Sequence, residues 1–448
     1  MWTLDGRRLS MGIVSATRQA DTRRTGDVRP PRIRHWTAKK QPPQDRFGER
    51  RNVFREDLQG QRMQVQKKIK AHSLTGRITP AVMYEAFRAV KRNRGAAGVD
   101  GVSIARFEKQ LDQNLLSLMR QLKAGTFQPQ PLRRVHIDKG GGKTRPLGIP
   151  AVRDRVAQEV LRRLLSPLFE RIFHHDSFGF RPGRGCHDAM QRLLELHRQG
   201  YTHVLDADIQ GFFDNLPHPV IMAGLAAEVA DGNILTLVER FLKAGVMEEG
   251  VLQPTRLGTP QGGVISPLLA NIALNSLDWR LESAGLRFVR YADDFVVVCR
   301  SREQAQEAHR MVQGHLNGIG LSLSAEKTKL TCFVEAFQFL GFRVGARSVT
   351  MRPKSMEKFK AGIVEATIRN RNLEADVVER INQIVRGVAN YFATSWTQVG
   401  RQFRDLDHWL RMRIRAMKFK RKHRTDNYRF QNRHLRNLGL IFLSDYCV

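Results

Sequence analysis

Two groups of aspartate residues have the residue types and the spacing that metal-assisted phosphoryl transfer needs. The first is Tyr291-Ala-Asp-Asp294, which lies between two apolar stretches, 286–289 and 295–298. Adjacent carboxylates in strand-forming surroundings are costly unless a cation neutralises them. The simplest geometry is a hairpin whose turn presents both acids, although a lone Asp-Asp pair is more often an ordinary acidic turn.

A second aspartate-bearing segment favours the metal interpretation. Residues 203–214 begin as a strand, in which Asp206 and Asp208 lie two apart and therefore on one face. If this strand ends beside the hairpin, three carboxylates meet at one point and can hold two Mg²⁺ ions roughly 3.5–4 Å apart. Such ions activate a 3′-hydroxyl and stabilise the departing pyrophosphate. We predict that Asp214 instead caps the following helix.

The elements that must position these acids alternate between strands and helices. Thr79 followed by Pro80 is typical of a helix start, and three glycines within residues 93–101 indicate a loop. Residues 258–267 contain three glycines and two prolines, which allow close backbone approach to a ligand. Apolar spacing predicts further helices over 156–165 and 268–277, so the fold class is α/β or α+β.

The chain changes character after residue 344. The sequence Asp376-Val-Val-Glu379 is typical of a capping box that opens a helix. A later apolar repeat predicts another helix, with Leu406, Leu410, Ile414 and Met417 on one face and basic residues on the others. We predict a separate helical, basic RNA-binding domain. The candidate RNA-binding residues are Arg411, Arg413, Arg415, Lys418, Lys420, Arg421 and Lys422.

Composition points to a polyanionic partner. The 448-residue chain has 75 Lys and Arg against 43 Asp and Glu, a formal charge of +32. No stretch approaches the ~18 apolar residues of a membrane span, and the start of the chain has no apolar signal segment. The four cysteines form no Cys-x-x-Cys pair, so no structural zinc is expected. We expect a cytoplasmic protein, associated with the nucleoid in a bacterium, that binds nucleic acid and no membrane.

A series of motifs between residues 78 and 344 resembles, in order, those of group II intron-encoded reverse transcriptases, the intron maturases. The residues after 344 resemble the thumb, or maturase, domain of that family less closely. The matching segments are 95–101, 143–150, 177–184, Asp208 with 212–213, 258–263, 291–294, 326–328 and 339–342.

The resemblance implies a right-hand polymerase and assigns its metal site. It predicts an α+β fold with fingers and palm over residues 61–345, then an α-helical thumb or maturase domain over 346–448. Residues 1–60, rich in Arg and Pro, are expected to be a disordered basic extension. Asp208, Asp293 and Asp294 would be the catalytic, Mg²⁺-binding trio, and Asp206 would be structural.

The resemblance also assigns nucleotide-binding roles. Arg145, with Lys139, would hold the incoming triphosphate, and Gln261 would contact the nascent base pair. Phe213 would lie beneath the sugar and exclude a 2′-hydroxyl. Lys327 would donate a proton to pyrophosphate, although it is equally well an ordinary surface lysine.

The expected activity is RNA-directed DNA synthesis by two-metal phosphoryl transfer to a primer 3′-hydroxyl. Expected partners are the intron's own RNA, an RNA template with a DNA primer, deoxynucleoside triphosphates and a DNA target. The protein would assist splicing and copy the intron during mobility. Many relatives carry a C-terminal nuclease domain with cysteine pairs. This sequence has no such cysteine pairs up to Val448, so we expect that the protein does not cleave its target DNA.

Three other functions share parts of this pattern. A splicing factor with an inactive polymerase would not need three converging carboxylates. An RNA-copying RNA polymerase would conflict with a bulky Phe213 beneath the sugar. A reverse transcriptase recruited to defence against foreign nucleic acid is not distinguished by sequence, and a flanking intron RNA would decide.

Overall fold

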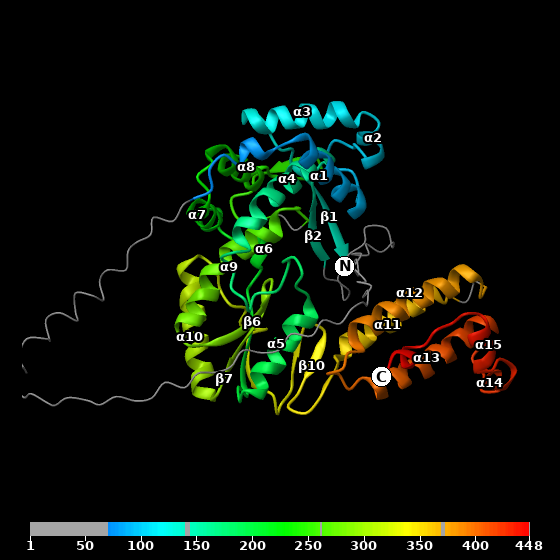
Figure 1. The fold of residues 1–448 in the computed structure, drawn as a ribbon. Helices are drawn as coiled ribbons and strands as arrows, with labels where there is room; N and C mark the ends of the chain where they lie inside the picture. The colour runs from blue at the N-terminus through cyan, green and yellow to red at the C-terminus, as the bar shows by residue number, and fades with distance from the viewer. Residues whose placement is uncertain (1–69, 139–143, 260–261, 369–371, 448) are drawn as a thin grey trace, which may run out of the picture.

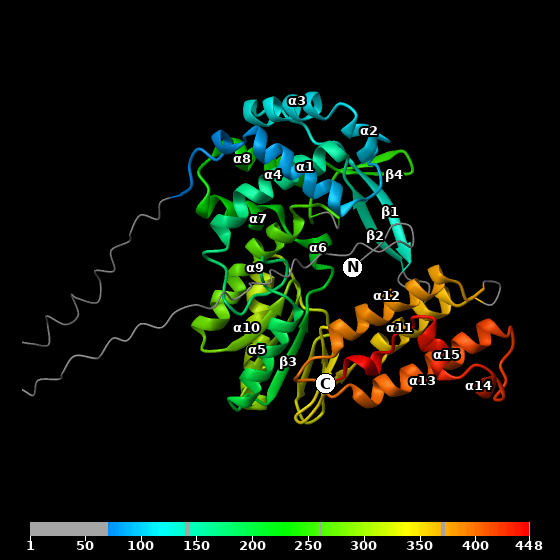
Figure 2. The same cartoon turned by 45° about the vertical axis from the view of Figure 1, so that its right-hand side comes forward.

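The computed structural model describes residues 70–138, 144–259, 262–368 and 372–447. Three small sheets and their covering helices follow one another in space (Figures 1 and 2). Helices α1, α3, α4 and α8 lie at one end of the molecule, and α11 to α15 lie at the other. The predicted mixture of strands and helices is therefore present.

The four-stranded sheet of order β2-β1-β4-β5 and the helices around it are here called the fingers. Thr79 caps the first long helix by accepting the N–H of Val82, and Pro80 takes the first helical position, as predicted. The elements are η1 Thr75–Arg77, α1 Pro80–Asn93, α2 Ile104–Glu108, α3 Leu111–Ala124, β1 Leu132–Asp138, β2 Thr144–Ile149, α4 Val152–Phe169, α8 Gly232–Lys243, β4 Val246–Glu248 and β5 Val251–Gln253.

The palm sheet, of order β6-β7-β3-β8, has both faces buried. Leu205, Phe288 and Val297 belong to one core, shared with α9 and α10. Val204 and Val296, on the opposite face, belong to a second core with α5 and the C-terminal helices. The elements are α5 Cys186–Arg198, β3 His203–Asp208, α6 Phe212–Asn215, α7 His218–Glu228, α9 Ser266–Ser283, β6 Arg287–Tyr291, β7 Asp294–Cys299, α10 Arg302–Gly318 and β8 Lys329–Cys332.

A third, antiparallel sheet of order β11-β10-β9 connects the palm to a helical region, here called the thumb. The predicted apolar face of α13 is buried at Leu406, Leu410, Ile414 and Met417. The elements are β9 Phe337–Phe339, β10 Phe342–Val344, β11 Val349–Met351, α11 Pro353–Ala366, α12 Ala375–Phe392, α13 Gly400–Lys418, α14 Asp426–Arg429, α15 Asn432–Asn437 and η2 Leu443–Tyr446.

Two of the predicted helix caps are wrong. Asp214 lies inside the short helix α6, whose N-cap is Gly211, and the N-cap of the next helix is Pro217. Asp376 lies in the first turn of α12, after the N-cap residue Glu374. An acid in the first turn stabilises a helix through the helix dipole without capping it, so the residue types alone misplace the boundary.

Among the described residues, no helix is long and apolar enough to cross a membrane. All four cysteines are unpaired. The predicted disordered extension, residues 1–60, lies outside the described part of the chain.

Candidate active site

The three candidate catalytic aspartates meet at one edge of the palm sheet. Strands β3 and β7 are antiparallel, with Asp208 directly opposite Asp294. Strands β6 and β7 form the predicted hairpin: Tyr291 pairs with Asp294, and Ala292 and Asp293 form the two-residue turn. Ala292 has φ 61°, a left-handed conformation that such tight turns require. The hairpin register therefore carries Asp293 and Asp294 to the end of β3.

Electrostatics at this edge favour a cation. The pKa of Asp294 is raised to about 7, first by removal of its carboxyl group from water and then by Asp206, Asp293 and Asp208. Because Asp294 is nevertheless exposed, repulsion by the neighbouring carboxylates is the firmer cause of this shift. Burial and the neighbouring Asp208 also raise the pKa of Asp206, to about 6. A hard divalent cation offsets the repulsion between carboxylate oxygens, so these residues fit a divalent metal.

Lys327 pairs with the carboxylate of Asp208. Its Nζ is 3.0 Å and 3.2 Å from the two carboxylate oxygens of Asp208, although its side chain is 65% exposed. The N–H of Ser324 donates to the backbone oxygen of Asp208 at 2.8 Å, which fixes this loop to the end of β3. An exposed ammonium group thus lies beside a candidate metal ligand, Asp208.

Phe213 is supported from two sides. Its ring packs edge-on against the buried Phe212, with centroids 5.2 Å apart. Its backbone oxygen accepts the N–H of Thr259 at 2.8 Å. With Pro146, Gly258 and other residues, Phe213 lines a pocket of about 280 Å³ between fingers and palm. Phe213 is therefore half-buried, packed against the core and placed at the wall of a cavity.

The glycine-rich loop joins the fingers to the palm. Gly262 has φ +116°, and a Cβ placed there would lie 2.4 Å from the backbone oxygen of Gly148 in β2. The buried Gln158 of α4 accepts the N–H of Val264 at 2.7 Å. Close backbone approach is thus the reason for glycine at position 262.

Three of the predicted nucleotide-binding side chains cannot be placed beside the aspartates. Lys139 and Gln261 lie outside the described residues. Arg145 is described only as a backbone position of β2, opposite Ile137. Their proposed roles stay predictions.

The predicted RNA-binding residues differ in what they contact. Arg413 donates to Thr367 at the end of α11, and Arg415 donates to the backbone oxygen of Phe430. Both guanidinium groups therefore join parts of the thumb to each other. Arg411 packs over the ring of Phe442. The remaining four are exposed around the end of α13: Lys418, Lys420, Arg421 and Lys422.

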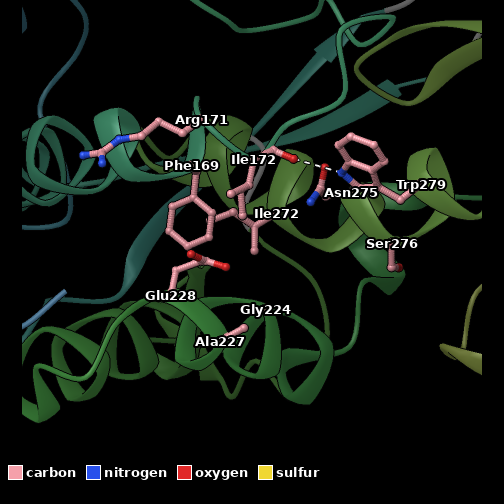
Figure 3. Close-up of a pocket in the computed structure, with 10 residues that line it drawn as sticks. All are labelled: Phe169, Arg171, Ile172, Gly224, Ala227, Glu228, Ile272, Asn275, Ser276 and Trp279. Carbon is pink, nitrogen blue, oxygen red and sulfur yellow. Dashed lines mark hydrogen bonds between the residues drawn. The ribbon is translucent and has the colours of Figure 1, made fainter. Parts of the chain in front are cut away.

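Other candidate sites do not coincide with the aspartates. The pocket of Figure 3, about 480 Å³, lies between α4, α7 and α9 and is walled by Phe169, Ile272 and Trp279. His174, His175 and Glu282 lie close enough together to share an ion. However, His174 Nδ1 accepts the N–H of Asp176, so a neutral ring carries its proton on Nε2, facing Glu282 at 3.4 Å. That tautomer cannot ligate a metal.

Sequence reasoning missed the residues behind the aspartate turn. Arg290 is fully buried beside Tyr291 and pairs with the equally buried Asp278. An arginine within an apolar strand is the signal that was available, since such a residue almost always has an acidic partner inside the protein. Which acid it would meet could not be read from spacing.

Two family models match the chain. Residues 137–344 match the reverse transcriptase (RNA-dependent DNA polymerase) family, and residues 356–439 match the group II intron maturase-specific domain. Protein YkfC of Escherichia coli is 35% identical over 307 residues, which cover 59% of this chain and 80% of that protein.

A second relative is longer than the matched region. The group II intron-encoded protein LtrA of Lactococcus lactis is 29% identical over 336 residues, or 60% of this chain and 56% of LtrA. The chain thus spans little more than half the length of LtrA.

Solved structures are similar at lower coverage or identity. A partial Cas6-RT-Cas1–Cas2 complex is 26% identical, with 56% of this chain and 42% of that chain covered and a TM-score of 0.37. Telomerase from Candida albicans, with a telomeric RNA fragment, is 15% identical; coverage is 74% and 67%, and the TM-score is 0.41.

Proposed function

The chain belongs to the reverse transcriptases of the group II intron type and is an RNA-directed DNA polymerase, and we propose that it acts as an intron maturase that uses two Mg²⁺ ions. It would bind its intron RNA, assist splicing, and copy the intron into DNA during mobility. Its substrates would be deoxynucleoside triphosphates, an RNA template with a DNA primer, and a DNA target.

The observation that carries this proposal is the register of the palm sheet. Asp208 and Asp294 are directly opposite, and the turn adds Asp293 beside them. Mg²⁺ held by these three acids would activate the primer 3′-hydroxyl and neutralise charge on the leaving pyrophosphate. Lys327, whose ammonium group is 3.0 Å from Asp208, would give a proton to pyrophosphate as it leaves.

The other nucleotide contacts are proposed from the family resemblance, and for Phe213 also from its place in the structure. Phe213 would pack under the deoxyribose, because its ring lines the pocket between fingers and palm. Lys139 and Arg145 would clamp the triphosphate, and Gln261 would contact the nascent pair. The thumb would contribute its exposed basic cluster to RNA binding, mainly through phosphates and shape.

The test of the metal site separates catalysis from binding. We expect Asp293→Ala and Asp294→Ala to abolish primer extension while RNA binding stays nearly intact, because both carboxylates would hold metal rather than RNA. Asp405→Ala, at an exposed position of α13, is the matched control and should extend primers normally. Polymerisation above a few per cent of wild type in either variant would contradict the assignment.

The intron role needs a different experiment. Purifying the protein with its bound RNA and sequencing that RNA should recover a group II intron. Recovery of unrelated RNA would contradict the maturase role and leave the polymerase activity standing.

A further inference from the structure

A buried ion pair lies directly behind the aspartate turn. Arg290, in β6, has no exposed surface, and its Nε donates to Asp278 Oδ1 at 2.7 Å. Its Nη2 donates to the other oxygen of the same carboxylate, which makes the pair forked. Asp278 is also fully buried, on α9. The charges of the two residues cancel, and neither meets water.

The remaining donor of this arginine reaches the turn itself. Nη1 of Arg290 is 2.9 Å from the backbone oxygen of Ala292 and 2.9 Å from Oδ1 of Asn271. Asn271 is two helical turns before Asp278, so both present their side chains from the same side of α9. Arg290, Asp278 and Asn271 are called the buried triad below.

The segment before α5 also packs closely against this turn. Gly179 lies so close that a Cβ there would be 2.2 Å from the backbone nitrogen of Ala292. Asn271 Nδ2 donates to the backbone oxygen of Gly179 at 2.8 Å. Backbone hydrogen bonds also join Phe178 and Asp176 to Arg290. Asn271 therefore contacts both Arg290 and the segment that packs against the turn.

The turn needs such restraint. Ala292 holds a left-handed φ of 61°, which an alanine adopts only when its surroundings impose it. The carboxylates that follow are adjacent in the chain and repel one another. Without fixed neighbours, the turn would relax towards a more common conformation and separate the acids.

We propose that the buried triad is a positioning device, which fixes the carbonyl group of Ala292 and thereby aims Asp293 and Asp294 at their metal. This inference rests on the proposed metal-binding role of these aspartates. Arg290 and Asn271 would act on the reaction through the turn, without touching substrate. Their loss should therefore reduce metal affinity and turnover more than nucleotide affinity.

The experiment uses the full chain with matched asparagine variants. Asn271→Ala removes the link to Arg290 and Gly179 but leaves the Arg290–Asp278 pair. Asn275→Ala, one turn later on α9, alters a residue that lines the pocket of Figure 3 instead. Arg290→Lys keeps the positive charge but cannot bond both oxygens of Asp278 at once. Gly179→Ala adds a Cβ that would overlap the backbone of Ala292. Asp293→Ala is the reference for loss of the metal site.

Four quantities are measured for each variant: the unfolding temperature, kcat, KM for a deoxynucleotide, and Mn²⁺ affinity from the electron paramagnetic resonance of the free ion. We expect Asn271→Ala, Arg290→Lys and Gly179→Ala to lower kcat by about 10–100-fold, the effect of a misplaced reacting group. Mn²⁺ affinity should weaken several-fold and KM should change less than twofold. Asn275→Ala should resemble wild type.

Wild-type kcat and Mn²⁺ affinity in the folded fraction of Asn271→Ala and Gly179→Ala would overturn the proposal, even if these proteins melt at a lower temperature, because the triad would then only stabilise the fold. If Asp293→Ala itself keeps Mn²⁺ affinity and activity, the metal assignment fails instead, and the two failures are distinguished.

Discussion

At the scale of single residues, the protein keeps several acids in surroundings that disfavour their charge. Asp294 and Asp206 share one edge of the palm sheet, where mutual repulsion is useful because a divalent cation relieves it. Asp154 is different: it is buried in α4, far along the chain from the aspartate turn, and no cation is expected there. Surroundings that disfavour a charged carboxylate therefore favour metal binding at the palm edge, whereas at Asp154 they lower the stability of the fold.

Asp154 should make stability fall as pH rises. Burial raises its pKa to about 7, against 3.8 in an unfolded chain, so the folded state binds the extra proton between these values. Stability is then lost as pH rises through this window, by about 1.4 kcal/mol per unit and about 4 kcal/mol at most. Asp154→Asn mimics the protonated acid and can still accept from Gln130. Its unfolding temperature should equal wild type near pH 4 and exceed it at pH 8.

The control for this prediction is Asp376→Asn, an exposed acid in the first turn of another helix. Its difference from wild type should not grow between pH 5 and pH 8. A constant difference for Asp154→Asn across the same range would show that its carboxyl group is not the source of the pH dependence.

Phe213 should select the sugar. A 2′-hydroxyl against its ring would overlap the ring and lose water without gaining a partner, and an unpaired buried hydroxyl costs about 1–3 kcal/mol. With the overlap, discrimination of about a hundredfold or more follows, at ~1.4 kcal/mol per tenfold. Phe213→Val should admit ribonucleotides with smaller losses for deoxynucleotides, as measured by single-nucleotide incorporation. Phe212→Leu, in the core, should instead lower stability.

An unchanged ratio of ribonucleotide to deoxynucleotide incorporation in a folded Phe213→Val protein would show that the ring is no gate. Equal loss of both activities would mean that Phe213 acts only as packing.

At the scale of elements, sequence predicted best what is decided locally. The Thr79–Pro80 helix start and the hairpin of 291–294 depend on neighbouring residues, and both are present. Asp376 was misplaced because first-turn and capping acids have the same residue types. Arg290 was missed because its partners, Asp278 and Asn271, are chosen by how α9 packs on β6. Such long-range packing has no periodic signature.

The contact between the glycine-rich loop and β2 should be essential for synthesis. Gly262→Ala would place a Cβ 2.4 Å from the oxygen of Gly148 and force fingers and palm apart. We expect kcat/KM for deoxynucleotides to fall by about tenfold or more, as misplacement near a reacting group does. Gly250→Ala is the matched control, because its φ is also positive, +84°, with nothing within 4 Å of the added Cβ. Similar losses in both would implicate backbone strain rather than the contact.

At the scale of the whole molecule, charge is divided between the ends of the sequence. Residues 352–448 carry 21 Lys and Arg against 9 Asp and Glu, and residues 1–70 carry 18 against 7. In the thumb, Arg413 and Arg415 use their guanidinium groups within the domain, so the surplus available to RNA lies around the end of α13. Arg421 is partly committed as well, since it pairs with the buried Asp426. The residues to test there are chosen for their exposure: Lys420, Lys422 and Arg424.

Replacing Lys420, Lys422 and Arg424 together by Gln should weaken intron RNA binding and its dependence on salt. Each phosphate contact contributes about 0.7–0.9 to the slope of log K against log salt, so three lost contacts should reduce the slope by about 2–3. Splicing should fall more than synthesis on a short annealed primer–template, because these residues belong to the thumb and the aspartates to the palm (Figure 2).

The matched control changes three exposed basic residues of the fingers, Lys109, Arg120 and Lys123, by the same total charge. An equal reduction in slope for both triple variants would mean that total charge, and no particular surface, attracts the RNA. A slope that stays at the wild-type value in the thumb variant would show that this cluster does not touch the phosphates.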